Sequence, residues 1–237
     1  MYLNRLSRRV FLRRLAKVAI VAALQNAHAG TVSRDDPRLE VGTLEYGGMR
    51  CYVARPRGDP DKLPALVVLH DGRGVDPHVQ DIARRAALEG FNAVAPEMPG
   101  ALPEREAVDD LIVLIDDLAA RHGTRRIGAI GFGRGGGMAN QLAVRSARVG
   151  AVASFYGSVP DAVDVPRIKA RLILHYAERD TRTNTGVPAF EAALKAAGIP
   201  HAVHMYPGTG PAFHDDGGEA AELAWRRTID FLKDALR

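Results

Sequence analysis

Residues 127–137 carry the pattern with the clearest chemical meaning in this sequence. An apolar run at residues 127–130 predicts a buried strand, a glycine-rich turn follows, and residues 138–144 have the composition of a helix. A strand, sharp turn and helix of this kind predict a nucleophile elbow, a G-x-Nu-x-G turn whose strained central residue presents Ser, Cys or Asp to a carbonyl carbon. The central residue here is Gly133, which has no side chain with which to attack.

Polar residues also follow three other apolar runs, and they could take part in the same chemistry. These segments are His70-Asp71-Gly72-Arg73-Gly74, Glu178-Arg179-Asp180, and residues 206–216, which include Pro211, His214 and Asp215. In open parallel sheets the ligand crevice lies beyond the carboxyl ends of the strands. We therefore expect the three segments to lie near Gly133 at one edge of a sheet.

The elements that must position these residues alternate between strand and helix. Apolar strand runs are predicted at 65–69, 91–95, 126–130, 150–155, 170–176 and 201–205, and residues with helical spacing lie between them and near the C-terminus. Residues 38–54 alternate around Gly47-Gly48, which predicts an opening hairpin. The sequence thus predicts an α/β fold with a mostly parallel central sheet, helices on both faces and an N-terminal antiparallel hairpin.

Residues 38–237 resemble the dienelactone hydrolase family, in particular its exported bacterial branch. The motifs that carry the resemblance are Val67-Val68-Leu69-His70, Gly131-Phe132, Gly135-Gly136-Gly137-Met138, Phe155-Tyr156-Gly157, Leu174-His175-Tyr176-Ala177-Glu178 and Tyr206-Pro207-Gly208-Thr209. The resemblance implies the α/β-hydrolase fold and one dienelactone hydrolase-like domain at residues 30–237.

The family hydrolyses carboxylic esters and lactones with a Cys-His-Asp triad, so the resemblance assigns roles to three positions. The aspartate falls on Asp180, but the cysteine falls on Gly133 and the histidine on Pro211. A family glutamate after the strand-end histidine is Asp71 here, and residues 96–126 are shorter than in relatives. Losing a triad nucleophile or base costs about 10⁶ in turnover, so we expect an impaired hydrolase.

The backbone of the expected site survives these substitutions. In this architecture the oxyanion hole uses the N–H of the residue after the nucleophile and one from an earlier loop, here Arg134 and Gly72. The helix beginning near Gly135 directs its positive end to the same place. The side chains of Arg73 and Arg134 would add charge only if they turned inward. The alternative function is therefore a non-catalytic periplasmic binding protein for a small anionic carbonyl compound, its ligand an ester, lactone or carboxylate.

Other side chains offer rival chemistries. His214 lies three residues beyond the lost histidine and is a candidate replacement base, although a loop residue outside the site is the simpler interpretation. A hydrolase with a rearranged site, in which Asp71 or His214 activates water, stays open. Ser154 and Ser158 are weaker nucleophile candidates because neither lies on an elbow. A purely scaffolding role has no supporting feature in the sequence.

Two other polar residues have simpler structural interpretations. We expect His70 to be a hydrogen-bonded histidine that supports the next loop. Asp180 could remain as a loop-capping carboxylate, because its histidine partner is gone.

The sequence does not predict a cofactor or a metal. Gly131-x-Gly133-x-x-Gly136 formally matches the dinucleotide fingerprint, but the next strand ends without an acid to hold a ribose hydroxyl. His201 and His204 would face opposite sides of a strand and so cannot chelate together. We expect His214, Asp215 and Asp216 to form a solvated polar loop.

The N-terminus predicts export. Residues 1–29 contain six basic residues and no acid, then a short apolar stretch and Ala27-His28-Ala29, as in a cleavable signal peptide. Ser7-Arg8-Arg9-Val10-Phe11-Leu12 resembles a twin-arginine signal, which predicts a periplasmic or secreted protein. The apolar stretch is too short for a permanent membrane anchor.

Without that segment, 26 basic residues face all 28 acids, so the formal charge falls from +4 to about −2. No basic stripe with interleaved aromatic residues remains, which argues against nucleic-acid binding. The single cysteine, Cys51, has no partner for an internal disulfide and is expected to be a small buried residue.

Overall fold

The computed structural model describes residues 31–58, 63–100, 102–123, 127–215 and 217–237. Val32 to Arg237 form one compact unit. The predicted signal peptide, residues 1–29, lies outside the described residues. In the described part of the chain, no helix has the length and hydropathy needed to span a bilayer.

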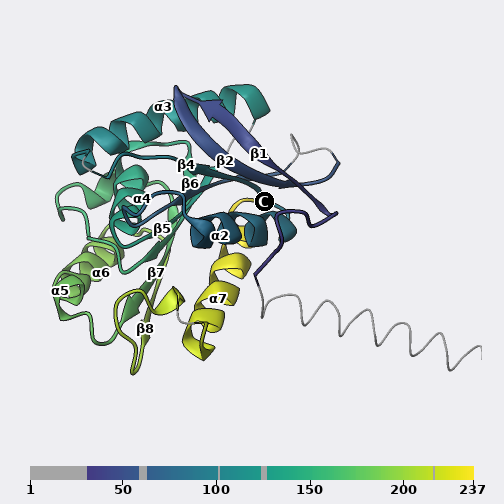
Figure 1. Ribbon diagram of the computed structural model, residues 1–237. Helices are drawn as coiled ribbons and strands as arrows, with labels where there is room; N and C mark the ends of the chain where they lie inside the picture. The colour runs from purple at the N-terminus through teal and green to yellow at the C-terminus, as the bar shows by residue number, and fades with distance from the viewer. Residues whose placement is uncertain (1–30, 59–62, 101, 124–126, 216) are drawn as a thin grey trace, which may run out of the picture. The chain divides into compact units, whose positions relative to one another are not determined.

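An eight-stranded sheet forms the centre of this unit, with strand order β1-β2-β4-β3-β5-β6-β7-β8 (Figure 1). The antiparallel pairs are β1 with β2 and β2 with β4, and all other neighbours run parallel. This confirms the predicted mostly parallel sheet with an N-terminal hairpin. The strands are β1 (Leu39–Tyr46), β2 (Met49–Pro56), β3 (Ala65–Leu69), β4 (Asn92–Pro96), β5 (Ile127–Phe132), β6 (Val149–Phe155), β7 (Arg171–Ala177) and β8 (His201–Tyr206).

Helices cover both faces of the sheet, as predicted (Figure 1). Buried residues of α2 and α7 belong to one hydrophobic core, and those of α3, α4 and α6 belong to the other. β3, β4 and β5 are buried along their whole length, as strands covered on both faces must be. The helices are α2 (Pro77–Leu88), α3 (Glu104–His122), α4 (Arg134–Arg145), α5 (Thr181–Asn184), α6 (Val187–Ala196) and α7 (Glu219–Ala235), with 3₁₀ turns η2 (Val165–Arg167) and η3 (Phe213–Asp215).

The hairpin turn is fixed to a helix as well as to its own strands. Gly47 and Gly48 have φ of 56° and 77°, the positive values that a two-residue type I′ turn requires. The N–H of Gly47 donates to Oδ2 of Asp117 on α3 at 2.8 Å. A Cβ on Gly47 would lie 2.7 Å from the backbone nitrogen of Leu114, so only glycine lets the turn contact α3 this closely.

β5 extends two residues beyond its predicted end. Gly131 and Phe132 still pair with Ser154 and Phe155 of β6, so the strand continues to the residue before Gly133. α4 begins immediately afterwards, at Arg134. Gly133 is therefore the single residue that joins a central strand to a helix.

Candidate functional site

Gly133 has the backbone geometry of a nucleophile elbow without the nucleophile. Its φ and ψ are 53° and −115°, and its N–H donates to the carbonyl oxygen of Phe155 at 2.9 Å. A Cβ built here would lie 3.4 Å from Cε2 of Tyr156 and 3.5 Å from Cβ of Asp71. There is room for a side chain, and the space adjoins two polar residues.

Glycines hold α4 against the strands behind the elbow. A Cβ on Gly135 would lie 2.3 Å from the carbonyl oxygen of Leu69, at the end of β3. A Cβ on Gly136 would lie 2.8 Å from the carbonyl oxygen of Phe155, at the end of β6. Because both contacts are with backbone atoms, side chains could not fit without moving the helix. The first turn of α4, with its unpaired N–H groups, is thus fixed at the carboxyl ends of β3, β5 and β6.

The two remaining positions of the expected triad do not act on Gly133. Pro211 lies exposed in the turn before η3 and has no group that could carry a proton. The Asp180 side chain accepts a hydrogen bond from the backbone N–H of Thr183 at 3.2 Å, and Asp180 is the N-cap of α5. The interpretation of Asp180 as a loop-capping carboxylate agrees with this contact.

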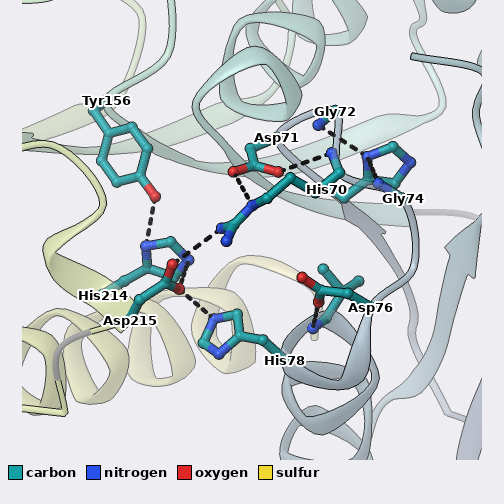
Figure 2. A network of polar contacts seen from close by, with 11 residues as sticks. His70, Asp71, Gly72, Gly74, Asp76, His78, Tyr156, His214 and Asp215 are labelled. Carbon is teal, nitrogen blue, oxygen red and sulfur yellow. Dashed lines mark hydrogen bonds and ion pairs between the residues drawn. The ribbon is translucent and has the colours of Figure 1, made fainter.

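His70 supports the loop after β3, as expected. It is fully buried, and its Nδ1 accepts from the N–H groups of Gly72 at 3.0 Å and Gly74 at 3.3 Å (Figure 2). Burial lowers the pKa of His70, so the ring stays neutral at neutral pH. The N–H of Gly72, expected as an oxyanion donor, is therefore occupied by His70 in this structure.

The two arginines near the elbow are held by other groups. Arg73 donates from Nε to Oδ2 of Asp71 at 2.8 Å and from a terminal nitrogen to Oδ2 of Asp215 at 3.0 Å. The guanidinium of Arg134 donates to the carbonyl oxygens of Gly100, at 3.1 Å, and Leu102. Both side chains are thus oriented by these contacts, and the backbone N–H of Arg134 lies at the start of α4.

His214 has a buried side chain beside Tyr156, which differs from the expectation that it forms part of a solvated polar loop. Its side chain is 8% exposed, and its ring stacks on Phe132 with centroids 4.2 Å apart. Nδ1 lies 2.5 Å from the hydroxyl of Tyr156, and Nε2 lies 2.9 Å from Oδ1 of Asp215 (Figure 2). From the one-turn helix η3 the ring faces inward, where it also contacts Phe155 with centroids 6.0 Å apart.

Two residues of this network were given no role from the sequence. Tyr156, at the end of β6, has φ of 39°, and its ring borders the space at Gly133. His78, in the first turn of α2, places Nε2 2.8 Å from Oδ1 of Asp215. The signal for Tyr156 was its place directly after a parallel strand, where ligand crevices form. Nothing in the sequence pairs the start of α2 with η3.

The other candidate residues have structural contacts. The hydroxyl of Ser154 is buried and donates to the carbonyl oxygen of Gly136 at 3.1 Å, whereas Ser158 is exposed. Nδ1 of His201 lies 2.7 Å from the carbonyl oxygen of Ile199, and His204 stacks on His175. Cys51 is buried in β2, and burial raises the pKa of its thiol to about 12. That value keeps Cys51 protonated, so it is not a nucleophile.

Comparisons with known proteins agree with this architecture. The model of the "Dienelactone hydrolase family" matches residues 49–101 and 99–236. A "Putative carboxymethylenebutenolidase" of Yersinia pestis is 28% identical over 218 residues, which cover 76% of this chain and 82% of the relative. A protein of the same name from Saccharolobus solfataricus is 28% identical over 244 residues, which cover 78% and 93% of the two chains.

Solved structures have the same fold. A structure described as a putative dienelactone hydrolase from Klebsiella pneumoniae superposes with a TM-score of 0.75 at 24% identity, covering 82% of this chain and 98% of that one. A dienelactone hydrolase-like promiscuous phosphotriesterase from metagenomic libraries has a TM-score of 0.72 at 19% identity, covering 84% and 100%.

Proposed function

The chain belongs to the dienelactone hydrolase family, and we propose that it is a member that has lost nucleophilic attack while keeping an elbow that binds a small ester, lactone or carboxylate. One observation carries the proposal. Gly133 keeps the positive φ of an elbow and the space for a side chain, but supplies no attacking atom.

The position of the general base supports the same conclusion independently. Pro211 is exposed and has no proton-accepting side chain, so a nucleophile at residue 133 would have no triad histidine to activate it. Asp180 uses a carboxylate oxygen to cap α5 rather than to orient an imidazole. Two of the three groups are absent and the third has a structural contact. Covalent catalysis of the family type therefore has neither its nucleophile nor its base.

Binding has better support than turnover. The amides in the first turn of α4 have no intrahelical acceptor and carry the positive end of the helix dipole, which favours a carboxylate or a carbonyl oxygen. Glycine contacts hold this helix start in place whatever residue occupies position 133. With the predicted export signal, the proposed ligand is a small anionic carbonyl compound met in the periplasm.

The test restores the missing groups. We expect the native chain and the single variants Gly133→Cys and Pro211→His to leave activated esters and a dienelactone almost unhydrolysed. The double variant Gly133→Cys with Pro211→His should gain several orders of magnitude in kcat/KM, because a triad nucleophile or base is worth about 10⁶. In the double variant we expect the Asp180 carboxylate to orient the new histidine. Adding Asp180→Asn should therefore reduce the gain in kcat/KM.

The matched control is Gly133→Ala with Pro211→His, which carries the same backbone strain and no thiol. Ester hydrolysis by the native chain that disappears in His214→Ala would contradict the proposal. It would favour instead a rearranged hydrolase in which His214 activates water. Activity in the alanine control equal to that of the cysteine double variant would also count against covalent attack at residue 133.

A further inference from the structure

Side chains from two distant elements converge on one carboxylate oxygen beside the elbow. His78 lies in the first turn of α2, and His214 and Asp215 lie in η3 (Figure 2). Nε2 of His78 is 2.8 Å from Oδ1 of Asp215, and Nε2 of His214 is 2.9 Å from the same oxygen. Each residue offers one ligand atom, and these atoms lie within 4.8 Å of one another.

We propose that His78, His214 and Asp215 bind a divalent first-row transition metal ion such as Zn²⁺. Two imidazoles and one carboxylate are a donor set that such ions prefer, and they leave one or more coordination positions open. Metal bonds of about 2.0 to 2.2 Å place neighbouring ligand atoms roughly 3 Å apart. The two distances from a histidine nitrogen to Oδ1 of Asp215 are close to that spacing, and the ligand atoms of the two histidines lie within 4.8 Å of each other, so side-chain movements would complete the site.

The contact between His78 and Asp215 is better suited to a shared ion than to a hydrogen bond. Nε2 of His78 is buried and, among the described residues, has no partner with hydrogen-bond geometry, although Oδ1 of Asp215 is near. A buried polar atom left unsatisfied costs free energy. An ion between the two histidines and the carboxylate would satisfy this nitrogen and Oδ1 together.

Neighbouring groups orient the ligand atoms. The Tyr156 hydroxyl holds Nδ1 of His214, which leaves Nε2 facing His78 and Asp215. Arg73 bonds Oδ2 of Asp215 and leaves Oδ1 toward the histidines. Hydrogen bonds of this kind to the far side of a ligand fix its orientation in known metal sites and raise its basicity.

The charges around the cluster suit a cation. Asp215 brings a carboxylate to the two imidazoles, and a metal binds a carboxylate and neutral imidazoles. Arg73 opposes a cation, but it also pairs with Asp71. Two carboxylates, of Asp71 and Asp215, therefore face one guanidinium, which leaves one net negative charge beside the two histidines.

The experiment titrates Zn²⁺ into the purified full chain, produced without a histidine tag and stripped with a chelator, in competition with a chromophoric chelator. We expect one equivalent to bind. His78→Ala and Asp215→Asn should each weaken binding by at least roughly 100-fold, and Tyr156→Phe by roughly 10-fold, because it removes only an orienting group. His201→Ala is the matched control, since it removes an imidazole outside the cluster and should leave the affinity unchanged.

Co²⁺ gives a second measurement. Its visible absorption should report nitrogen and oxygen ligands in the native chain and vanish in Asp215→Asn, which keeps the size of the side chain. Circular dichroism melts check that each variant is folded, and His78, with a side chain 34% exposed, tolerates truncation better than a core residue. Failure of the native chain to bind an equivalent of either ion, or equal binding by native chain, His78→Ala and Asp215→Asn, would overturn the proposal.

Discussion

Gly133 occupies a backbone conformation that other residues adopt only under strain. Replacing it with alanine should lower the free energy of unfolding by about 1 to 3 kcal/mol, because φ is 53° even though the Cβ has room. Urea denaturation measures the change. Gly210→Ala is the control, since its Cβ meets nothing within 4 Å and its φ lies outside the strained range, so the change should stay within about 0.5 kcal/mol. Equal effects of both substitutions would refute the claim that the elbow is strained.

Residues within one motif could be predicted from the sequence, and residues that meet across the fold could not. Gly133 is recognisable because strand, turn and helix follow one another directly in the chain. The buried position of His214 depends on stacking against Phe132, and its contact with His78 depends on how α2 and η3 dock. These contacts arise from packing between distant segments, for which a single sequence carries no periodic signal.

At the scale of elements, glycines determine how closely α4 approaches the sheet. Gly135→Ala should lower the free energy of unfolding by roughly 1 to 3 kcal/mol, because its Cβ would overlap the carbonyl oxygen of Leu69 and force the helix outward. Gly42→Ala on β1, where nothing lies within 4 Å, is the matched control. Thermal unfolding compares the two, and a Gly135→Ala protein as stable as the control would contradict the tight contact.

Element types were easier to predict than element boundaries or neighbours. β3 coincides with the predicted run because Pro64 precedes it and polar residues follow it. β5 ends later than predicted. Gly131 has no apolar side chain that would indicate a strand, but pairing with β6 extends the strand through it. α6 was not among the predicted helices, although its buried residues Val187, Phe190 and Leu194 have i, i+3 and i+7 spacing.

For the whole molecule, buried histidines should make stability depend on pH. Burial lowers the pKa of His70 and of His214, and it lowers the pKa of His175 well below its ordinary value. The hydroxyls of Tyr206 and Thr228 are hydrogen-bonded to the ring of His175. The unfolded chain therefore binds more protons once the pH falls below about 6.5, and stability decreases from there toward the folded pKa values. Above that pH these histidines should no longer make the free energy of unfolding depend on pH.

Chemical denaturation at several pH values measures this dependence. We expect a loss of roughly 1 to 3 kcal/mol between pH 7 and pH 5.5, in a window above the usual titration of carboxylates. His175→Gln should make the dependence shallower, because it removes the imidazole whose pKa burial lowers well below its ordinary value, and it keeps a hydrogen-bonding side chain. A free energy of unfolding that stays constant across this range would disprove the assignment to histidines.

The attachment of the Gly47 turn to α3 has a consequence for the order of folding. Gly47 and Asp117 are 70 residues apart in the chain, so their hydrogen bond closes a long loop. The bond between the hairpin turn and α3 cannot form until α3 has formed, whereas the parallel pairing of β5, β6 and β7 joins strands that are neighbours in the chain. The hairpin end of the sheet should therefore assemble after the folding transition state, and weakening this attachment should speed unfolding more than it slows folding.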